Sequence, residues 1–170
     1  MGGKCHFIGP ACTDNFQIVE EKFIFRQWSW WSVEQAYQAS KFGRSTVPHH
    51  NIAGAFPADG ESDEDFGMRV WNAGQQDDGW PMVENWEEEK VKVMLLANVA
   101  KFESSELYRT LLAATGTMPI VAQPSTWEWQ FWNSRIMVWI RRSINDKRLS
   151  SFGFDMNKLS GPEVMEYLRV

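Results

Sequence analysis

Cysteine and histidine are scarce in this chain of 170 residues, and the scarcity excludes two classes of protein. The two cysteines, Cys5 and Cys12, could close only one short loop, which argues against a disulfide scaffold and favours free thiols in a reducing compartment. His49 and His50 are adjacent in a predicted loop, where we expect both to face solvent. Because no acidic or cysteine residue is spaced to complete a site with them, no metal is predicted.

Long apolar runs and several nucleotide motifs are also missing. No run is long enough to span a membrane, and no basic-then-apolar segment opens the chain, so we expect a cytoplasmic or nuclear protein with no membrane partner. The absence of a glycine-rich phosphate loop, a serine elbow or a Cys–His arrangement leads us to predict no cofactor. A net charge of −5 argues against broad non-specific binding of nucleic acid, but it permits a small local contact to a nucleotide.

The length and an apolar content of 44% are sufficient for one domain, 1–170, with a core of its own. No oligomeric state is predicted. Tryptophan is unusually abundant, and most of the rings are expected in the core, whereas some could line a pocket that stacks a flat base or sugar. The ten are Trp28, Trp30, Trp31, Trp71, Trp80, Trp86, Trp127, Trp129, Trp132 and Trp139.

Hydrophobic periodicity and caps predict a mainly α protein with a few short β-strands, an α+β fold. The expected helices are 32–44, 62–74, 85–102, 105–116, 135–144 and one beginning at 160. The expected strands are 16–19, 22–26 and 118–122, and the expected loops are 45–60 and 77–81.

Several side chains can be assigned to core or surface from the same patterns. In the helix over 85–102 the expected core stripe is Val91, Met94, Leu95, Asn98 and Phe102. In the helix over 105–116 the expected inward residues are Leu107, Tyr108, Leu111 and Leu112. The expected solvated groups are Asp63-Glu64-Asp65, Glu87-Glu88-Glu89 and the pair Arg141-Arg142, with Lys101 either at the surface or structural.

The helix over 32–44 carries the most informative polar residues. Ser32 is a good N-cap, and Gln35 stands three residues later, as in a capping box. Glu34 and Lys41 share one face with their Cα atoms about 10.5 Å apart. A carboxylate and an ammonium placed in this way could flank a small polar ligand. The helix dipole alone would also favour an acid at the start and a base at the end.

Five short motifs in order extend this helix into a longer pattern. They are Asp14-Asn15-Phe16, the run from Ser32 to Phe42, the pair Lys90 and Met94, Ala100-Lys101-Phe102, and Leu111 to Gly116. Their order and spacing resemble the NADAR superfamily, which includes YbiA-like N-glycosidases of riboflavin intermediates and hydrolases that remove ADP-ribose from guanine. Partial matches follow at Gly74-Gln75, Asn85-Trp86 and Asn157-Lys158-Leu159, so the resemblance covers nearly the whole chain.

The resemblance implies a NADAR/YbiA-like fold and a set of site residues without a metal. Glu34 is expected to act as acid/base, and Lys41 to hold a phosphate, donate to the leaving group or attack as a Schiff-base nucleophile. The expected substrate-binding residues are Asn15, Phe16, Tyr37, Gln38, Trp86, Lys90, Glu128, Trp132 and Asn133. For Trp86 a place in the core is an equal alternative.

Departures from the family pattern bear on the substrate. Gln35 stands where a histidine is usual, Gln75 where an arginine is usual, and Trp129 at the family's aspartate, with Glu128 as the candidate substitute. Because these positions carry polar pocket groups in the riboflavin-type enzymes, the departures favour a hydrolase that removes ADP-ribose from guanine of DNA or RNA. The alternatives are an N-glycosidase of phosphorylated riboflavin-pathway intermediates and a non-catalytic ADP-ribose-binding module.

Overall fold

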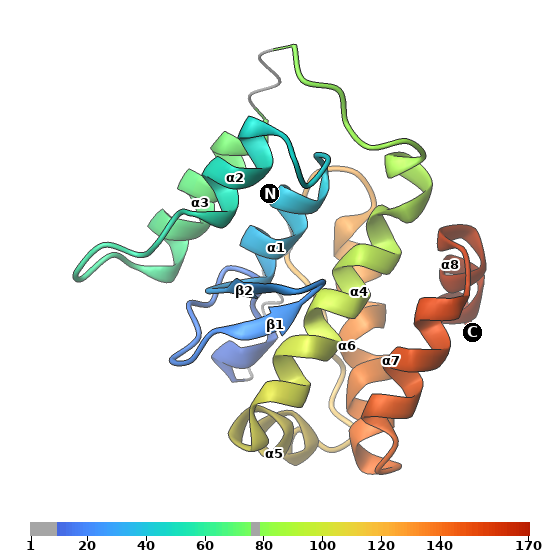
Figure 1. The fold of residues 1–170 in the computed structure, drawn as a ribbon. Coiled ribbons are helices and arrows are strands. Elements are labelled where there is room, and N and C mark those ends of the chain that lie inside the picture. The colour runs from blue at the N-terminus through green and yellow to red at the C-terminus, as the bar shows by residue number, and fades with distance from the viewer. Residues whose placement is uncertain (1–9, 76–78) are drawn as a thin grey trace.

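A computed structural model describes residues 10–75 and 79–170 (Figure 1). It confirms a mainly helical chain with a two-stranded antiparallel sheet. The elements are η1 (Ala11–Thr13), β1 (Phe23–Phe25), β2 (Trp28–Trp30), α1 (Val33–Ser40), α2 (Val47–Ala53), α3 (Asp63–Ala73), α4 (Trp86–Ser104), α5 (Glu106–Ala114), α6 (Trp129–Asn145), α7 (Leu149–Lys158) and α8 (Gly161–Arg169). Cys5 and residues 77–78 of one predicted loop lie outside the described residues.

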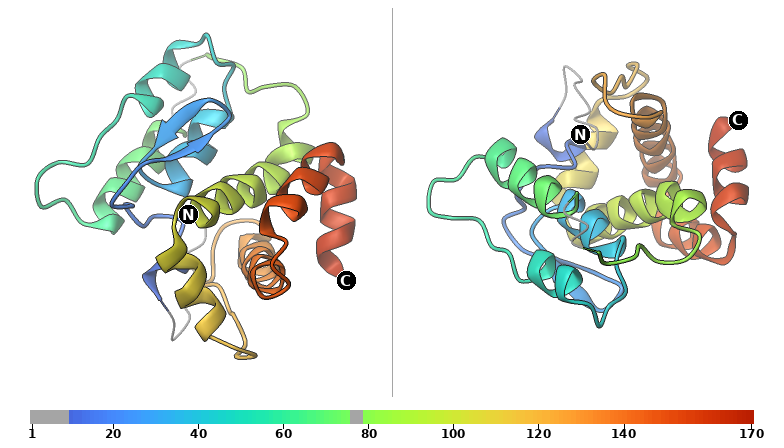
Figure 2. Two further views of the ribbon diagram at one scale, coloured as in Figure 1. Left: turned by 60° about the horizontal axis from the view of Figure 1, so that its bottom comes forward. Right: turned by 90° about the horizontal axis from the view of Figure 1, so that it is seen from above.

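Helix α4 is the centre of the fold. It packs against α1, β1, α5, α6, α7 and α8, with α1–α3 and the hairpin on one side and α6–α8 on the other (Figure 2). Its predicted core stripe is confirmed, because Val91, Met94, Leu95, Asn98 and Phe102 are all buried. The helices therefore share one hydrophobic core.

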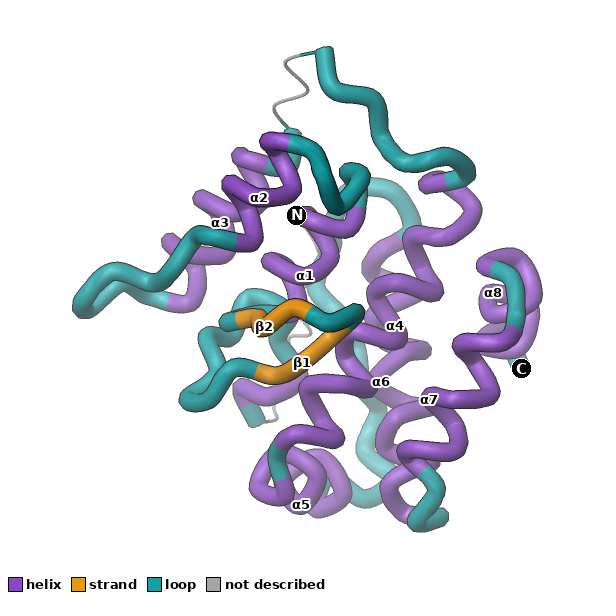
Figure 3. The backbone as a smooth tube through the Cα atoms, viewed as in Figure 1, coloured by secondary structure: helices purple, strands orange, loops and turns teal. Residues whose placement is uncertain are grey.

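The hairpin β1–β2 lies beside α1 and α4 (Figure 3). Phe23 pairs with Trp30 and Phe25 with Trp28, so the connection is a two-residue turn of Arg26 and Gln27. Both turn residues have positive φ, of 50° and 72°, as a type I′ turn requires. The prediction of a strand over 22–26 is confirmed in its central part.

Residues 16–19 and 118–122 do not form the predicted strands. The amide of Ile18 donates to the side chain of Asp63, which is therefore half-buried and bonded rather than simply solvated. The amide of Ala122 donates to Ser134 Oγ instead of a neighbouring strand. In both segments a backbone amide is bonded to a side chain instead of a neighbouring strand. An alternation of apolar and polar residues does not show whether such a strand partner exists.

The predicted loop over 45–60 contains α2. Thr46 caps it by accepting from the amide of His49 at 3.4 Å, and Pro48 stands in its first turn. Proline marks loops in general, but in the first turn of a helix its missing amide costs nothing. The prediction is therefore wrong over Val47–Ala53.

Helices α1 and α6 differ in length from the prediction, and α7, like α2, was not predicted. Helix α1 ends at Ser40 rather than 44, and α6 begins at Trp129 rather than 135. Helix α7 was missed because Gly153 stands at its centre, where glycine weakens a helix. An added Cβ at Gly153 would lie 2.7 Å from Val99 of α4, so the glycine permits close helix packing.

Two core assignments predicted for α5 are wrong, whereas Lys101 takes the structural one of its two predicted places. Leu107 and Leu111 are exposed, while Tyr108 and Leu112 alone of that set are buried. Lys101 is fully buried and structural, and its Nζ donates to the carbonyl of Asp14.

The adjacent basic pairs also differ from the expectation. His49 is buried and only His50 faces solvent, because the His49 ring bonds the carbonyl of Ala39 at 2.9 Å. Arg141 is buried and donates to Thr115 Oγ1 and to the carbonyl of Met118, so only Arg142 is at the surface.

Candidate functional site

The first turn of α1 positions Glu34. Ser32 Oγ accepts from the amide of Gln35 at 3.1 Å, as predicted, but Gln35 Oε1 accepts from the amide of Trp31 rather than that of Ser32. The capping box is therefore only half formed. The Gln35 amide group donates to the carbonyls of Ile52 and Ala55, so Gln35 anchors α1 to the end of α2.

The Glu34 carboxylate is fully buried. Its Oε1 accepts from Gln38 Nε2 at 2.6 Å, whereas its Oε2 has no hydrogen-bond partner among the described residues. Burial raises the pKa of Glu34 to about 7, although the Gln38 hydrogen bond and the charge of Lys41 oppose the rise. A carboxyl group that titrates near neutral pH and has a free oxygen is suited to acid/base chemistry.

Lys41 follows the last turn of the same helix. Its Nζ donates to the carbonyl of Gly74 at 3.2 Å and lies 5.9 Å from the centre of the Tyr37 ring. Partial burial lowers the pKa of Lys41, while the charges of Glu34 and Glu87 raise it. The two predicted catalytic residues therefore interact electrostatically, and the amine is drawn toward its neutral, nucleophilic form.

Three buried asparagines connect α4 and α6 beside Glu34. Asn98 Nδ2 donates to Asn15 Oδ1 at 2.9 Å, and Asn15 Nδ2 donates to Asn133 Oδ1 at 3.2 Å. The carbonyl of Asn15 accepts from the amide of Glu34 at 2.9 Å. In the described part of the chain Asn133 Nδ2 has no acceptor, so one buried donor of this chain of amides is unsatisfied.

Asn98 was predicted as part of the core stripe of α4, not as a site residue. The signal that could have identified it is its polarity within an otherwise apolar stripe. A buried amide needs partners, and in this fold the partner is Asn15.

Aromatic rings from three helices meet at Tyr37. The Trp86 ring centre lies 5.1 Å from it and the Trp129 ring centre 5.3 Å away, the latter edge-on. Farther out, Lys90 Nζ lies 3.6 Å from the centre of the Trp127 ring and pairs with Glu87. The structure thus places Trp86 and Lys90 on the same side of α4 as Tyr37, and it adds Trp129, which was not among the predicted site residues.

Three other predicted residues make different contacts. Phe16 is buried against α3, where an added Cβ at Gly67 would lie 2.3 Å from its ring. Trp132 is fully buried and donates to the exposed Glu128 at 3.2 Å. Glu128 lines a separate cavity of about 420 Å³ with Arg169. Among the described residues, none of these three donates a hydrogen bond to the Glu34 carboxylate.

Gly74 brings α3 against Gln38 and Lys41, and its replacement tests the arrangement. A Cβ at Gly74 would lie 2.0 Å from Gln38 Oε1, so Gly74→Ala should displace the Gln38 side chain and weaken its bond to Glu34. We expect the free energy of unfolding to fall by about 1–3 kcal/mol, as in other overpacked sites. We also expect the pKa of Glu34 to rise further, measured by NMR titration.

The matched control is Gly43→Ala, whose Cβ would meet only Thr46 at an ordinary 3.5 Å. It should leave both the stability and the Glu34 pKa nearly unchanged. An unaltered Glu34 pKa in Gly74→Ala would show that the glycine does not position Gln38.

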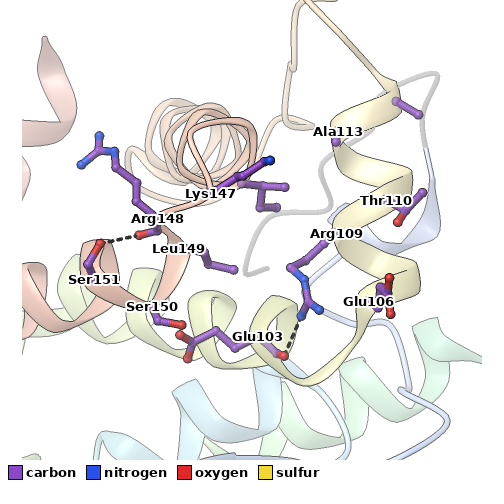
Figure 4. Close-up of a pocket in the computed structure, with 12 residues that line it drawn as sticks. Glu103, Glu106, Arg109, Thr110, Ala113, Lys147, Arg148, Leu149, Ser150 and Ser151 are labelled. Atoms are coloured by element: carbon purple, nitrogen blue, oxygen red, sulfur yellow. Dashed lines mark hydrogen bonds between the residues drawn. The ribbon is translucent and has the colours of Figure 1, made fainter.

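A large cavity far from Glu34 in the chain is lined by no buried titratable residue. It measures about 1040 Å³ and lies between α5, the end of α6 and the start of α7 (Figure 4). Arg109 on its wall is already engaged with the carbonyls of Phe102 and Glu103. Because no lining residue is a buried titratable group, this cavity offers no counterpart to Glu34.

Neither a metal nor a membrane is indicated within residues 10–75 and 79–170. No group of three or more histidine, cysteine or acidic residues is clustered there for a metal ion. Among the described helices, none combines the length and apolarity needed to cross a bilayer.

Comparison with known proteins supports the fold. No family model matches the chain, and no curated protein matches it. The chain is similar to the NMR structure of the E. coli protein YbiA, with a TM-score of 0.63 over 82% of this chain and 80% of that one. At 22% identity the likeness concerns architecture alone. The fold expected from the resemblance is thereby supported, and the chain has a YbiA-like, mainly helical fold.

Proposed function

We propose that this protein is an N-glycosidic hydrolase that removes ADP-ribose from guanine bases of nucleic acid. The observation that carries the proposal is the buried Glu34 carboxylate, with its unpartnered oxygen and a pKa of about 7, in the field of Lys41. The ordered motifs that resemble the NADAR superfamily and the YbiA-like fold support the same class of reaction.

The proposed chemistry uses Glu34 as an acid and Lys41 as a nucleophile. An N-linked ribosyl amine can open its sugar ring, which exposes C1 to attack. Neutral Lys41 Nζ forms a bond to C1, the bond from C1 to the guanine nitrogen breaks, and protonated Glu34 gives its proton to the departing amine. Water then adds to the protonated C1–Nζ imine and gives its proton to the Glu34 carboxylate, and breaking of the C1–Nζ bond releases ADP-ribose, restores the neutral lysine and leaves Glu34 protonated as at the start.

The surrounding groups suit binding of the base and ribose. The rings of Tyr37, Trp86 and Trp129 are buried against one another, so we propose that they part to admit the base, and base–aromatic stacking would then contribute about 1–3 kcal/mol per base. Asn133 Nδ2 offers a buried donor to a substrate oxygen. Because the chain carries a net charge of −5, we expect an exposed or flipped base, or a short strand, rather than long duplex contact.

A substrate panel tests the function. Purified protein is incubated with a guanine-ADP-ribosylated oligonucleotide and, separately, with phosphorylated riboflavin intermediates, and products are followed by mass spectrometry. We expect release of ADP-ribose from the oligonucleotide by wild type and not by Lys41→Ala. Cleavage of only the riboflavin intermediates, or binding of ADP-ribose without turnover of either substrate, would contradict the proposal.

A further inference from the structure

A small cavity of about 210 Å³ lies where the β1–β2 hairpin meets α2 and the end of α1. Ser40 and Phe42 line it, whereas the Nζ of the intervening Lys41 bonds Gly74. Val83, another wall residue, donates its amide to the carbonyl of Lys41 at 2.8 Å. The cavity, called the hairpin pocket below, is therefore lined by the neighbours of Lys41 in the chain and by Val83, which bonds its carbonyl, while the Lys41 amine is bonded to Gly74.

Two arginines give the hairpin pocket unneutralised positive charge. Arg26 comes from the hairpin turn and Arg44 from the segment after α1, and both are exposed. In the described part of the chain, no carboxylate forms an ion pair with either guanidinium. The charge of Glu89 reaches Arg26, but the oxygens of Glu89 contact the Gly161 amide and Lys92.

The two arginines lie close enough for their charges to act on each other. Desolvation and the charge of Arg44 both lower the pKa of Arg26. Arg26 is also held with φ of 50°, a left-handed conformation that is unfavourable for a residue with a side chain. An arrangement that keeps like charges together is stabilised when an anion binds between them.

A tryptophan and a buried histidine complete the hairpin pocket. The Trp28 ring is half-buried and lies edge-on to His49 and His50, with ring centres 5.0 and 5.4 Å away. His49 is 3% exposed; its Nδ1 bonds the carbonyl of Ala39, and its Nε2 has no partner among the described residues. The pocket thus combines an aromatic surface, a buried polar atom without a partner, and two guanidinium groups.

We propose that the hairpin pocket binds a phosphodiester of the nucleic-acid strand next to the modified guanine, with Arg26 and Arg44 on the phosphate and Trp28 against the adjoining sugar or base. This inference rests on the proposed function, because it names the polymer as the substrate. Guanidinium pairs suit phosphate oxygens, and an aromatic ring beside them is the usual device for holding single strands. The hairpin pocket adjoins Lys41 but does not contain its amine. It is therefore placed to hold a nucleotide next to the modified guanine rather than the ribose that reacts.

The test is binding, measured without turnover. A fluorescent, unmodified single-stranded 12-mer is titrated with wild type, Arg26→Gln, Arg44→Gln and the control Arg142→Gln, whose arginine is exposed on α6. We expect each pocket variant to bind about tenfold more weakly, as for loss of one charge-assisted contact. The slope of log affinity against log salt should fall by about 0.7 per arginine removed. The control should match wild type.

Free ADP-ribose and inorganic pyrophosphate are titrated as competitors of the 12-mer. They show whether the hairpin pocket binds the phosphodiester of a strand or the phosphate of a small ligand. Binding of the 12-mer that is equal in all four proteins would overturn the inference, and so would an effect of Arg26→Gln and Arg44→Gln on ADP-ribose but not on the 12-mer. These outcomes are separable from failure of the proposed function. If the protein binds the strand through both arginines but hydrolyses nothing, the pocket inference holds and the proposed function fails. If it hydrolyses the substrate but both arginine variants bind the strand as wild type does, the function holds and the pocket inference fails.

Discussion

Glu34→Gln is expected to lower the turnover of a guanine-ADP-ribosylated oligonucleotide by about 100- to 10,000-fold, the usual contribution of a general acid or base. The amide cannot give or take the proton, yet its oxygen can still accept from Gln38 Nε2, so the site should keep its shape. Turnover is measured by mass spectrometry. The matched control is Glu166→Gln, which removes an exposed carboxylate on α8 and should leave turnover unchanged.

The same variant should have a distinctive dependence of stability on pH. Glu34 has a folded-state pKa of about 7 against an ordinary 4.5, so between these values the folded protein binds more protons than the unfolded chain. The contribution of Glu34 to the stability of wild type is therefore greatest below pH 4.5 and is lost as the pH rises through 7, whereas the glutamine variant has no such contribution. Between pH 4.5 and 7 the free energy of unfolding of the variant, relative to that of wild type, should therefore increase by about 3 kcal/mol.

Urea unfolding of both proteins at pH 4.5, 6 and 8 measures this difference, and other titrating groups cancel in the comparison. A constant difference across the three values would mean that Glu34 titrates normally, and the acid/base role would lose its physical basis. Loss of turnover without the pH signature would indicate instead a purely structural carboxylate.

Lys41→Met is expected to reduce turnover by at least about 100-fold, equivalent to about 3 kcal/mol of transition-state stabilisation. The role proposed for Lys41 requires a neutral amine, and burial lowers the pKa of this side chain. Borohydride added during turnover should reduce an imine and leave wild type with a covalent adduct heavier than the protein by ADP-ribose less one oxygen atom. Lys41→Met should form none.

Lys41→Arg separates the two chemical roles of this residue, because it keeps a positive charge but cannot form the imine. We expect it to be as inactive as Lys41→Met, while Lys158→Met, which removes an exposed lysine of α7, should behave as wild type. Substantial activity in Lys41→Arg would assign Lys41 to electrostatic binding of the substrate and exclude covalent catalysis.

Much of the fold is predictable where the controlling interactions are local. Ser62 caps α3 by accepting from the amide of Asp65, and Ser160 with Glu163 forms a complete capping box at α8. Both starts agree with the prediction because a cap needs only residues three apart. Helix α7 was missed because the role of its central glycine is not local. Gly153 allows α7 to pack closely on Val99 of α4, a residue more than fifty positions away in the chain.

In the candidate site, too, the residues that depend on local sequence are predictable and those that depend on contacts between distant segments are not. Glu34 and Lys41 are recognisable from their spacing on one helix and from the motifs around them. Trp129 and Asn98 are not recognisable as neighbours of that helix, because their contacts with Tyr37 and Asn15 depend on how α4 and α6 pack. Gly74 likewise matters only because α3 is placed against Gln38.

The amino-acid sequence by itself determined the mainly helical class and the starts of the well-capped helices, because these rest on interactions within a few turns, and its motifs supplied the two residues on which the proposed chemistry depends. Only the tertiary structure decided the burial of Glu34, with its raised pKa, and the cluster of Arg26, Arg44 and His49 around one cavity. Desolvation and charge proximity are properties of packed surfaces. They arise only when segments distant in the chain exclude water from the same group.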